Sequence, residues 1–386
     1  MNTLQAKAQV DQRIKILTVS PFSSMYGGEL VLLEVAKGID KQIFAPTVVS
    51  CGEGPLLDEL RKLDIPVKII DMPYLTPRGL QGIRFAIGCL PSVYRLGTFI
   101  RKHEFDLVYN NILQNPYGAV AAFFAGVPCI WHIHEMGKSR ILQWISTRVA
   151  GLLATKLIVV SRAVRQLFSS RAQKKIQIVY NGIDPDYYNP EHFPKSMCRQ
   201  DLRIESHHNV VGFVGRLHPS KRPLDLLHAF DALHKKWPDL LLLYIGEGEL
   251  REDLLNESRR LDIEQRVRLM GYIKDMRPIY AALDILVLPS HHEAQGRVLI
   301  EAMAMNKPVV ATHVGGIPET VGKDAGILVP VGNIAALSAA ISELIRNPSL
   351  ADKMGRRGRH RVLEYFTLKQ NIKQIEDVLL SVVQMV

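Results

Sequence analysis

Short runs of Ile, Val and Leu alternate along the chain with amphipathic segments of helix length, and this alternation constrains the fold most. In the first half the runs occupy residues 14–20, 44–50, 67–71, 107–109, 128–133, 157–160 and 176–180. They lack polar alternation, which is typical of parallel strands covered on both faces. Amphipathic segments such as 29–38 and 56–63 lie between them. The first half therefore predicts a doubly wound, Rossmann-like α/β domain.

The pattern then stops and starts again. From residue 181 to 209 the periodicity is lost, and three prolines and many turn-forming residues occur. Strand-like runs return at 210–214, 240–245, 267–270, 285–289, 308–312 and 326–329, with helical patterns at 222–234 and 249–261. We expect two parallel-sheet domains, 1–184 and 209–366, joined by a linker over 185–208. Two such domains place the carboxyl ends of their strands at a central cleft, where ligands bind.

The chain of 386 residues carries a formal net charge of +10, and the positive excess is concentrated in one segment. Between Arg78 and Lys175 there are 14 Lys and Arg residues and three acids, which are Glu104, Asp106 and Glu135. Such a field attracts anions: phosphate-bearing substrates, nucleic acid or an acidic membrane leaflet. Nucleic acid is not expected as a partner, because the basic residues alternate with long aliphatic helices and no known nucleic-acid module is present.

The sequence also indicates where in the cell the protein is expected. It has no apolar run of the ~18–20 residues that span a bilayer and no signal-peptide core, so we expect a cytoplasmic protein. Residues 78–102 mix basic and large apolar side chains, as an interfacial helix does, but Gly82, Gly88, Pro91 and Gly97 are expected to break them. Peripheral contact with the acidic inner face of the cell membrane is therefore an alternative expectation. The four cysteines lie far apart, which predicts neither a zinc site nor disulfides.

Residues 290–304 are the most informative stretch for chemistry. Glu293 follows a strand, Gly296 stands where the next helix begins, and Glu301 lies inside that helix. Ionised carboxylates accept hydrogen bonds from adjacent hydroxyls such as those of ribose and hexose, and the free amides of a helix N-terminus favour phosphate. Acids that merely stabilise a helix N-terminus would look the same.

Two turns suggest anion binding. Gly215 and Arg216 end a strand, and Lys221 begins the next helix after a short turn. Two cations five residues apart around a turn can converge on one diphosphate. Gly27 and Gly28 join the first strand to its helix and leave the helix amides open to an anion. The turn with Gly27 and Gly28 fits neither the dinucleotide nor the Walker motif.

In this order, these residues resemble the retaining glycosyltransferases of family 4, which have the GT-B fold. Glu293 and Glu301 match the family's E-x7-E motif. Gly215, Arg216 and Lys221 are similar to its clamp for the donor diphosphate. The resemblance covers most of the chain and is strongest over its second half.

Other short motifs stand in family order. Residues 181–184 (NGID) resemble the segment that links the two domains, and Gly246 belongs to a similar glycine motif. The Gly-Gly pair and His134 of WHIHE resemble the acceptor-side loop and the cleft histidine. In one departure, Lys221 is followed by Arg222, where the family usually has glycine.

The resemblance implies a hexosyltransferase with a UDP-, GDP- or ADP-linked sugar as donor. The implied catalytic residues are His134, Arg216, Lys221 and Glu293. The implied donor-binding residues are Gly27, Gly28, Gly215, Arg216, Lys221, Gly246, Ile273, Glu293, Ala294, Gly296, Arg297 and Glu301. Arg216 and Lys221 would take the task that a metal ion performs in other transferases, so neither a metal nor another cofactor is expected. Adjacent His291 and His292 would point to opposite sides of an extended chain and are not expected to share an ion.

The resemblance also implies the remaining roles. Glu301 would hold the ribose, Glu293 the sugar hydroxyls, and the backbone of Ile273 the base, while His134 would reach the sugar. The expected acceptor is an anionic or lipid-linked glycan or a polysaccharide. The last helix, 367–386, would complete the first domain. Two alternatives stay open: a nucleotide-sugar epimerase or hydrolase of the same architecture, and a noncatalytic nucleotide-sugar-binding scaffold.

Overall fold

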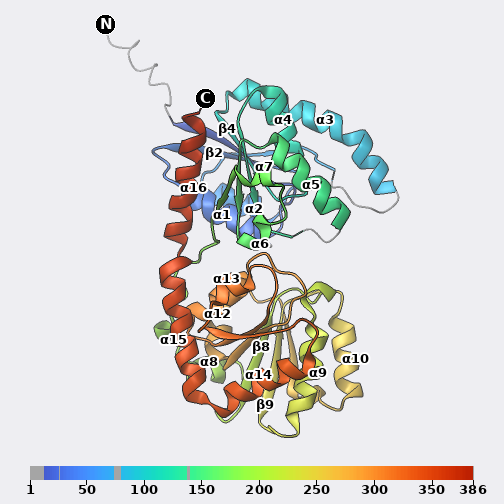
Figure 1. The fold of residues 1–386 in the computed structure, drawn as a ribbon, viewed down its shortest axis with the longest axis vertical. Helices are drawn as coiled ribbons and strands as arrows, with labels where there is room; N and C mark the ends of the chain where they lie inside the picture. The colour runs from blue at the N-terminus through green and yellow to red at the C-terminus, as the bar shows by residue number, and fades with distance from the viewer. Residues whose placement is uncertain (1–12, 26, 74–79, 137–139, 386) are drawn as a thin grey trace. The chain divides into compact units, whose positions relative to one another are not determined.

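The computed structural model describes residues 13–25, 27–73, 80–136 and 140–385, with residues 80–88 given only as part of a helix (Figure 1). The chain divides into two compact units. Unit 1 comprises Met1–Val179 and Asn371–Val386, and unit 2 comprises Tyr180–Gln370. Each unit is built around one sheet of parallel strands flanked by helices, which confirms the predicted fold class of two Rossmann-like α/β domains.

Unit 1 contains a seven-stranded sheet in the order β3-β2-β1-β4-β5-β6-β7. The strands are β1 Ile14–Val19, β2 Phe44–Ser50, β3 Val67–Ile69, β4 Leu107–Asn111, β5 Cys129–Ile133, β6 Lys156–Val159 and β7 Ile176–Ile178. The helices are α1 Gly27–Gly38, α2 Pro55–Lys62, α3 Leu80–His103, α4 Tyr117–Ala125, α5 Arg140–Leu153, α6 Arg162–Arg165, α7 Ser170–Gln173 and α16 Leu368–Val383. Each strand lies within or overlaps one of the predicted runs.

The C-terminal helix α16 packs in the core of unit 1. Ile375 and Leu379 of α16 are buried in one cluster with Val31 and Val35 of α1 and with Tyr109 of β4. Their spacing of four residues puts each pair on one helix face, so both helices present an apolar stripe to the sheet. The boundary between the two units falls inside α16, after its first turn.

Helix α3 corrects one prediction. Glycines and Pro91 were expected to break residues 78–102, but α3 runs without interruption from Leu80 to His103. Leu96 and Ile100 are buried, and Gly97 lies so close to α4 that an added Cβ would be 3.7 Å from Ala121 O. Packing against α4 therefore outweighs the weak helix propensity of these residues.

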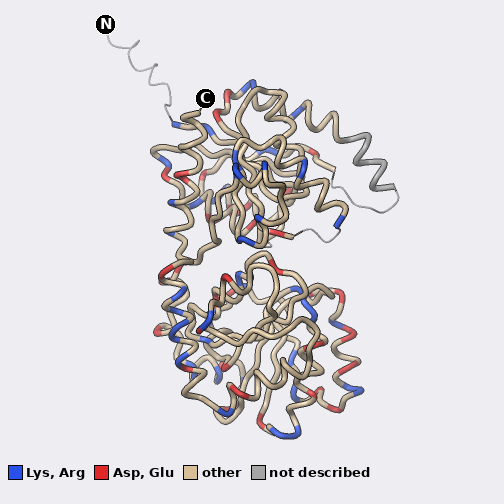
Figure 2. The backbone as a smooth tube through the Cα atoms, viewed as in Figure 1, with Lys and Arg blue, Asp and Glu red and all other residues tan. Residues whose placement is uncertain are grey.

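Two helices of unit 1, α3 and α5, carry an excess of basic residues (Figure 2). α3 and α5 contain arginines and one lysine but no Asp or Glu, and α4 contains no charged residue. None of the helices in the described part of the chain has both the length and the hydropathy needed to cross a bilayer.

Unit 2 contains a six-stranded sheet in the order β10-β9-β8-β11-β12-β13. The strands are β8 Asn209–Val214, β9 Leu240–Ile245, β10 Val267–Gly271, β11 Ile285–Leu288, β12 Val309–Thr312 and β13 Gly326–Val329. The α-helices are α8 Lys195–Asp201, α9 Pro223–His234, α10 Arg251–Arg260, α11 Arg277–Ala282, α12 Arg297–Ala304, α13 Ile317–Val321, α14 Ile334–Arg346 and α15 Pro348–Tyr365. Three short 3-10 turns are η1 Pro190–His192, η2 Pro219–Lys221 and η3 Glu264–Arg266.

Residues 185–208, which we expected to form a linker, lie within unit 2 and include η1 and α8. Arg199 of α8 is buried: its Nε donates to Ala282 O at 3.0 Å, and its guanidinium pairs with Asp284 at 2.7 Å. Gly182 lies against Thr367, where a Cβ would be 2.4 Å from the carbonyl oxygen. The segment without periodicity is therefore held by polar contacts, which a search for apolar periodicity does not detect.

Candidate functional site

The structure brings ten of the predicted residues to one edge of the sheet of unit 2. Gly215 follows β8, Gly246 follows β9, and Glu293 lies in the loop after β11. β8 and β11 are neighbours in the sheet although two strands separate them along the chain. Loops that leave such neighbouring strands diverge to opposite faces, and ligands of open parallel sheets bind between them.

Lys221 and Glu293 form an ion pair at this edge. Lys221 ends η2, and its Nζ contacts Oε2 of Glu293. A hydrogen bond of 2.8 Å from His291 N to Ser220 O holds the two loops together. The side chains of Lys221 and Glu293 are 27% and 15% exposed, so both remain accessible to a ligand.

Arg216 stands at the beginning of the same turn, with its side chain exposed. Its guanidinium has no hydrogen bond or ion pair to any residue that the structure describes. His218 caps η2, because its Nδ1 accepts a hydrogen bond from Ser220 N at 3.1 Å. This cap fixes the course of the chain between the two cations, Arg216 and Lys221.

Glu301 lies buried in α12, and both of its carboxylate oxygens are held. Arg297 Nε donates to Oε1 at 2.9 Å, and the Tyr280 hydroxyl donates to Oε2 at 2.8 Å. Burial, and then the neighbouring carboxylate, raise the pKa of Tyr280, so its hydroxyl stays a donor. A carboxylate oxygen has a second lone pair, which leaves Glu301 able to accept from a ligand hydroxyl.

The loop 293–296 is fixed by a buried side chain. Gln295 accepts from Asn181 N at 2.8 Å and donates to Asn181 O at 3.2 Å. Ala294 is buried beside it, and Gly296 caps α12 with a φ of 88°. That left-handed conformation favours glycine, so the sequence Ala-Gln-Gly suits the loop.

Glycines let three strand ends of unit 2 approach closely. At Gly246, which has a φ of 132°, an added Cβ would be 2.1 Å from Gly215 O. Gly246 N donates to Gly271 O at 2.8 Å, which joins the ends of β9 and β10. Ile273 follows two residues later, is half-buried and packs against the core of unit 2.

Arg222 stands where the family usually has glycine. It has a φ of 51°, in the left-handed region where a glycine pays no steric cost. Its Nε and Nη2 pair with the two carboxylate oxygens of Asp225, the latter at 3.1 Å. This bidentate pair helps to hold an arginine at a position suited to glycine.

The predicted residues of unit 1 lie at the carboxyl edge of its own sheet. Gly27 and Gly28 begin α1, and Asn111, at the end of β4, donates from Nδ2 to Gly28 O at 3.3 Å. β1 and β4 are neighbours in the sheet although two strands separate them along the chain, as β8 and β11 are in unit 2. The two glycines therefore stand at the point of this sheet where ligands are expected.

His134 follows β5, and its ring lies against that of a second histidine, tilted by 45°. Its ring centroid is 3.7 Å from that of His132, which is fully buried. The Tyr109 hydroxyl contacts Nδ1 of His132. Burial, and then His134, lower the pKa of His132 well below its usual range, so His132 is neutral at physiological pH.

Three residues of these sites were not predicted: Tyr280, Gln295 and His218. Tyr280 lies in an apolar helix, so its sequence context is that of a core residue. Gln295 offered a signal, because an amide between Ala294 and Gly296 in a buried loop must find hydrogen-bond partners. His218 offered a weaker one, because a histidine before Pro-Ser can cap a turn.

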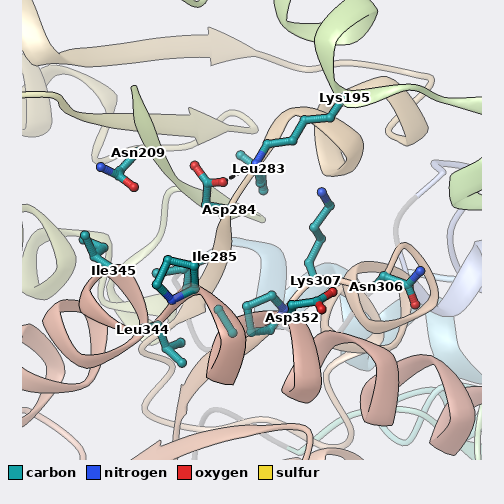
Figure 3. Close-up of a pocket in the computed structure, with 13 residues that line it drawn as sticks. Lys195, Asn209, Leu283, Asp284, Ile285, Asn306, Lys307, Leu344, Ile345 and Asp352 are labelled. Carbon is teal, nitrogen blue, oxygen red and sulfur yellow. Dashed lines mark hydrogen bonds and ion pairs between the residues drawn. The ribbon is translucent and has the colours of Figure 1, made fainter. Parts of the chain in front are cut away.

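A cavity of about 240 Å³ lies at the opposite end of this sheet, beside the amino ends of β8, β11 and β12 (Figure 3). Lys195 reaches Asp284 there, and Lys307 donates from Nζ to Ala281 O at 2.8 Å. Burial lowers the pKa of Lys307 to about 8. This cavity is separate from the edge that carries Lys221 and Glu293.

Replacing Lys307 with methionine is expected to raise the free energy of unfolding at pH 7 by about 1–3 kcal/mol. The folded pKa of about 8 lies below the ordinary 10.5, so the folded chain disfavours the ammonium. As pH rises from 8 to 10.5, Lys307 loses its proton in the folded chain before it does so in the unfolded chain. The gain in the free energy of unfolding from Lys307→Met therefore shrinks toward zero over this range. Urea denaturation at both ends of this range measures the gain. Exposed Lys323→Met is the matched control, and an equal gain at both pH values would contradict the assignment.

Two family models match the chain, one on each half. The model described as "Glycosyltransferase Family 4" matches residues 25–187, and the model described as "Glycosyl transferases group 1" matches residues 195–361. The matched ranges contain all the residues discussed above as candidates, including His134 in the first and Glu293 in the second.

Curated relatives and solved structures agree with these models. An Escherichia coli UDP-Gal:alpha-D-GlcNAc-diphosphoundecaprenol alpha-1,3-galactosyltransferase is 25% identical over 388 residues, covering 96% of this chain and 98% of the relative. The Staphylococcus aureus capsular polysaccharide biosynthesis glycosyltransferase CapM is 28% identical over 68% of this chain and 72% of its own. The crystal structure of Anabaena HepE with UDP and glucose has a TM-score of 0.82 and 26% identity, covering 96% of this chain and 100% of that one. The chain therefore belongs to the glycosyltransferases of family 4 and has their GT-B fold.

Proposed function

We propose that the protein transfers a hexose-type sugar from a nucleotide-diphosphate donor to a lipid-linked or polysaccharide acceptor, with retention and without a metal ion. The observation that carries this proposal is the grouping at the carboxyl edge of unit 2. Exposed Arg216 and the Lys221–Glu293 pair stand there with Glu301 buried nearby. Two cations and two carboxylates suit a diphosphate joined to two sugars.

The cations assist departure of the donor diphosphate. As the bond between the sugar C1 and the phosphate oxygen breaks, negative charge grows on that oxygen, and Arg216 and Lys221 stabilise it. In other transferases a metal ion stabilises this charge, and here the two side chains replace the metal ion. The acceptor oxygen forms the new bond to C1 on the same face, and its proton passes to the departing phosphate.

The carboxylates orient the two sugars. Glu301, held by Tyr280 and Arg297, accepts from the ribose hydroxyls of the nucleotide. Glu293 exchanges its contact with Lys221 for the hydroxyls of the transferred sugar, and amides near Gly296 assist. The backbone at Ile273 contacts the base. His134 keeps the role that the resemblance implies, a contact with the sugar or the reacting centre.

The acceptor class is supported by two observations. The E. coli relative is named for a diphosphoundecaprenol-linked acceptor, and CapM for capsular polysaccharide biosynthesis. The excess of basic residues from Arg78 to Lys175 suits an anionic acceptor. We place the enzyme in the cytoplasm, with peripheral contact to the inner face of the cell membrane.

A time-resolved NMR assay tests the proposal. UDP-, GDP- and ADP-sugars are each incubated with the protein, in a chelator, with and without a diphosphate-lipid or oligosaccharide acceptor. We expect acceptor-dependent transfer whose first product keeps the anomeric configuration of the donor. Inverted product would refute retention alone. Release of free sugar or an epimerised donor without acceptor would instead favour the epimerase or hydrolase.

A further inference from the structure

Large apolar side chains project outward from α5 of unit 1. Ile141, Trp144 and Leu152 are 72%, 61% and 79% exposed, and their spacing puts them on one helix face. The buried residues of this helix are the small Thr147 and Ala150. The fully buried side chains of α5 are therefore small, whereas several of its largest apolar side chains are exposed.

The neighbouring helices α4 and α3 also expose apolar side chains. α4 contacts both α3 and α5 (Figure 1). Near the end of α4, Phe123 and Phe124 are exposed, with their rings in edge contact at 5.6 Å. α3 exposes Leu90 and Tyr94. Apolar patches of this kind on a protein surface mark contact with a partner or a membrane.

This surface is also basic. α5 carries Arg140 and Arg148 and no acid (Figure 2). The Arg148 guanidinium lies 5.4 Å from the centre of the Trp144 ring. Arg101 of α3 donates to Phe124 O at 3.2 Å, so a third guanidinium lies beside the exposed phenylalanines. Aromatic rings with arginines beside them suit the boundary between lipid headgroups and acyl chains.

We propose that the outer face of α5, with the exposed residues of α4 and α3, docks on a membrane surface rich in anionic lipids. This inference rests on the proposed function, in which a lipid-linked acceptor is presented at such a surface. Trp144 and the aliphatic side chains enter the interface, and the arginines contact lipid phosphates. A second copy of the chain suits the face less well, because paired copies would bring arginines together without an acid on α5 to meet them.

Vesicle flotation tests this docking. The full chain is mixed with vesicles of phosphatidylglycerol and phosphatidylcholine, or of phosphatidylcholine alone. We expect at least about tenfold stronger partitioning to the anionic vesicles, weakened by added salt. The double variant Ile141→Ser/Trp144→Ser is expected to lose about tenfold or more of that partitioning. Met197→Ser, which changes an exposed apolar side chain on unit 2, is the matched control and should bind as the wild type does.

Several results would overturn the docking proposal. One is equal partitioning of the wild type to both kinds of vesicle. Another is a double variant that unfolds in urea as the wild type does and still binds anionic vesicles as strongly. Sedimentation showing a dimer that the double variant loses, without vesicle binding, would assign the face to self-association. Parallel transfer assays separate the two proposals: vesicle binding without any sugar transfer contradicts the proposed function only, and transfer without vesicle binding contradicts this inference only.

Discussion

Replacing Lys221 with alanine is expected to lower kcat/KM for sugar transfer by about 10²–10³-fold. The ammonium would neutralise charge that develops on the leaving diphosphate, so its loss raises the transition state more than the ground state. Lys221→Arg keeps the charge and is expected to retain part of the rate. Lys236→Ala, on the exposed surface of unit 2, is the matched control. Steady-state kinetics with a saturating acceptor measures the effect.

The contact between Lys221 and Glu293 predicts how the effects of two substitutions combine. Because the two side chains touch, Lys221→Ala and Glu293→Gln should be strongly non-additive in kcat/KM. The denaturation midpoint should change little, since an ion pair at an accessible edge contributes modestly to stability. If Lys221→Ala kept more than about a third of the wild-type kcat/KM, the proposed role of this cation in leaving-group departure would be wrong.

Replacing Gly246 with alanine is expected to destabilise unit 2 by about 3 kcal/mol or more, which corresponds to a drop in Tm of roughly 10 °C. The φ of 132° is strained for alanine, and its Cβ would lie 2.1 Å from Gly215 O, a backbone atom that cannot rotate away. Moving Gly215 also moves Arg216, so nucleotide affinity should fall together with stability.

Calorimetric unfolding and nucleotide titration measure the two effects of Gly246→Ala. Gly52→Ala is the matched control, because no described atom lies within 4 Å of the added Cβ and φ is outside the left-handed region. If Gly246→Ala left both Tm and nucleotide affinity unchanged, the ends of β8 and β9 could separate without cost. That result would contradict the close packing described above.

The sequence predicted the strands of both sheets and the spatial grouping of four candidate residues in unit 2. Buried parallel strands need continuous Ile, Val and Leu, so their apolar runs are visible without tertiary information. Arg216, Lys221, Glu293 and Glu301 were expected together, and the structure places them at one edge, because parallel strands bring their carboxyl ends to the same side of a sheet. The family assignment is confirmed by the matched models.

The errors of prediction arose where polar or close backbone contacts decide the structure. Arg199 anchors α8 through hydrogen bonds, which leave no periodic apolar signal. α3 continues through Gly97 because that residue packs against α4. The membrane interpretation considered only residues 78–102 and did not include the exposed apolar side chains of α5, because their exposure depends on how that helix packs in the folded chain. Tyr280 could not be distinguished from core because its hydroxyl meets Glu301 only after folding.

The most direct test of the central claim is calorimetric titration of UDP, GDP and ADP into the wild type and Arg216→Ala, with a chelator present throughout. The claim is that cations fixed in the chain, and not a metal ion, hold the donor diphosphate. We predict tight binding of at least one diphosphate by the wild type in chelator, weakened about 10–100-fold by Arg216→Ala. Binding that disappears in chelator and returns with a divalent ion, or that Arg216→Ala leaves intact, would contradict the account.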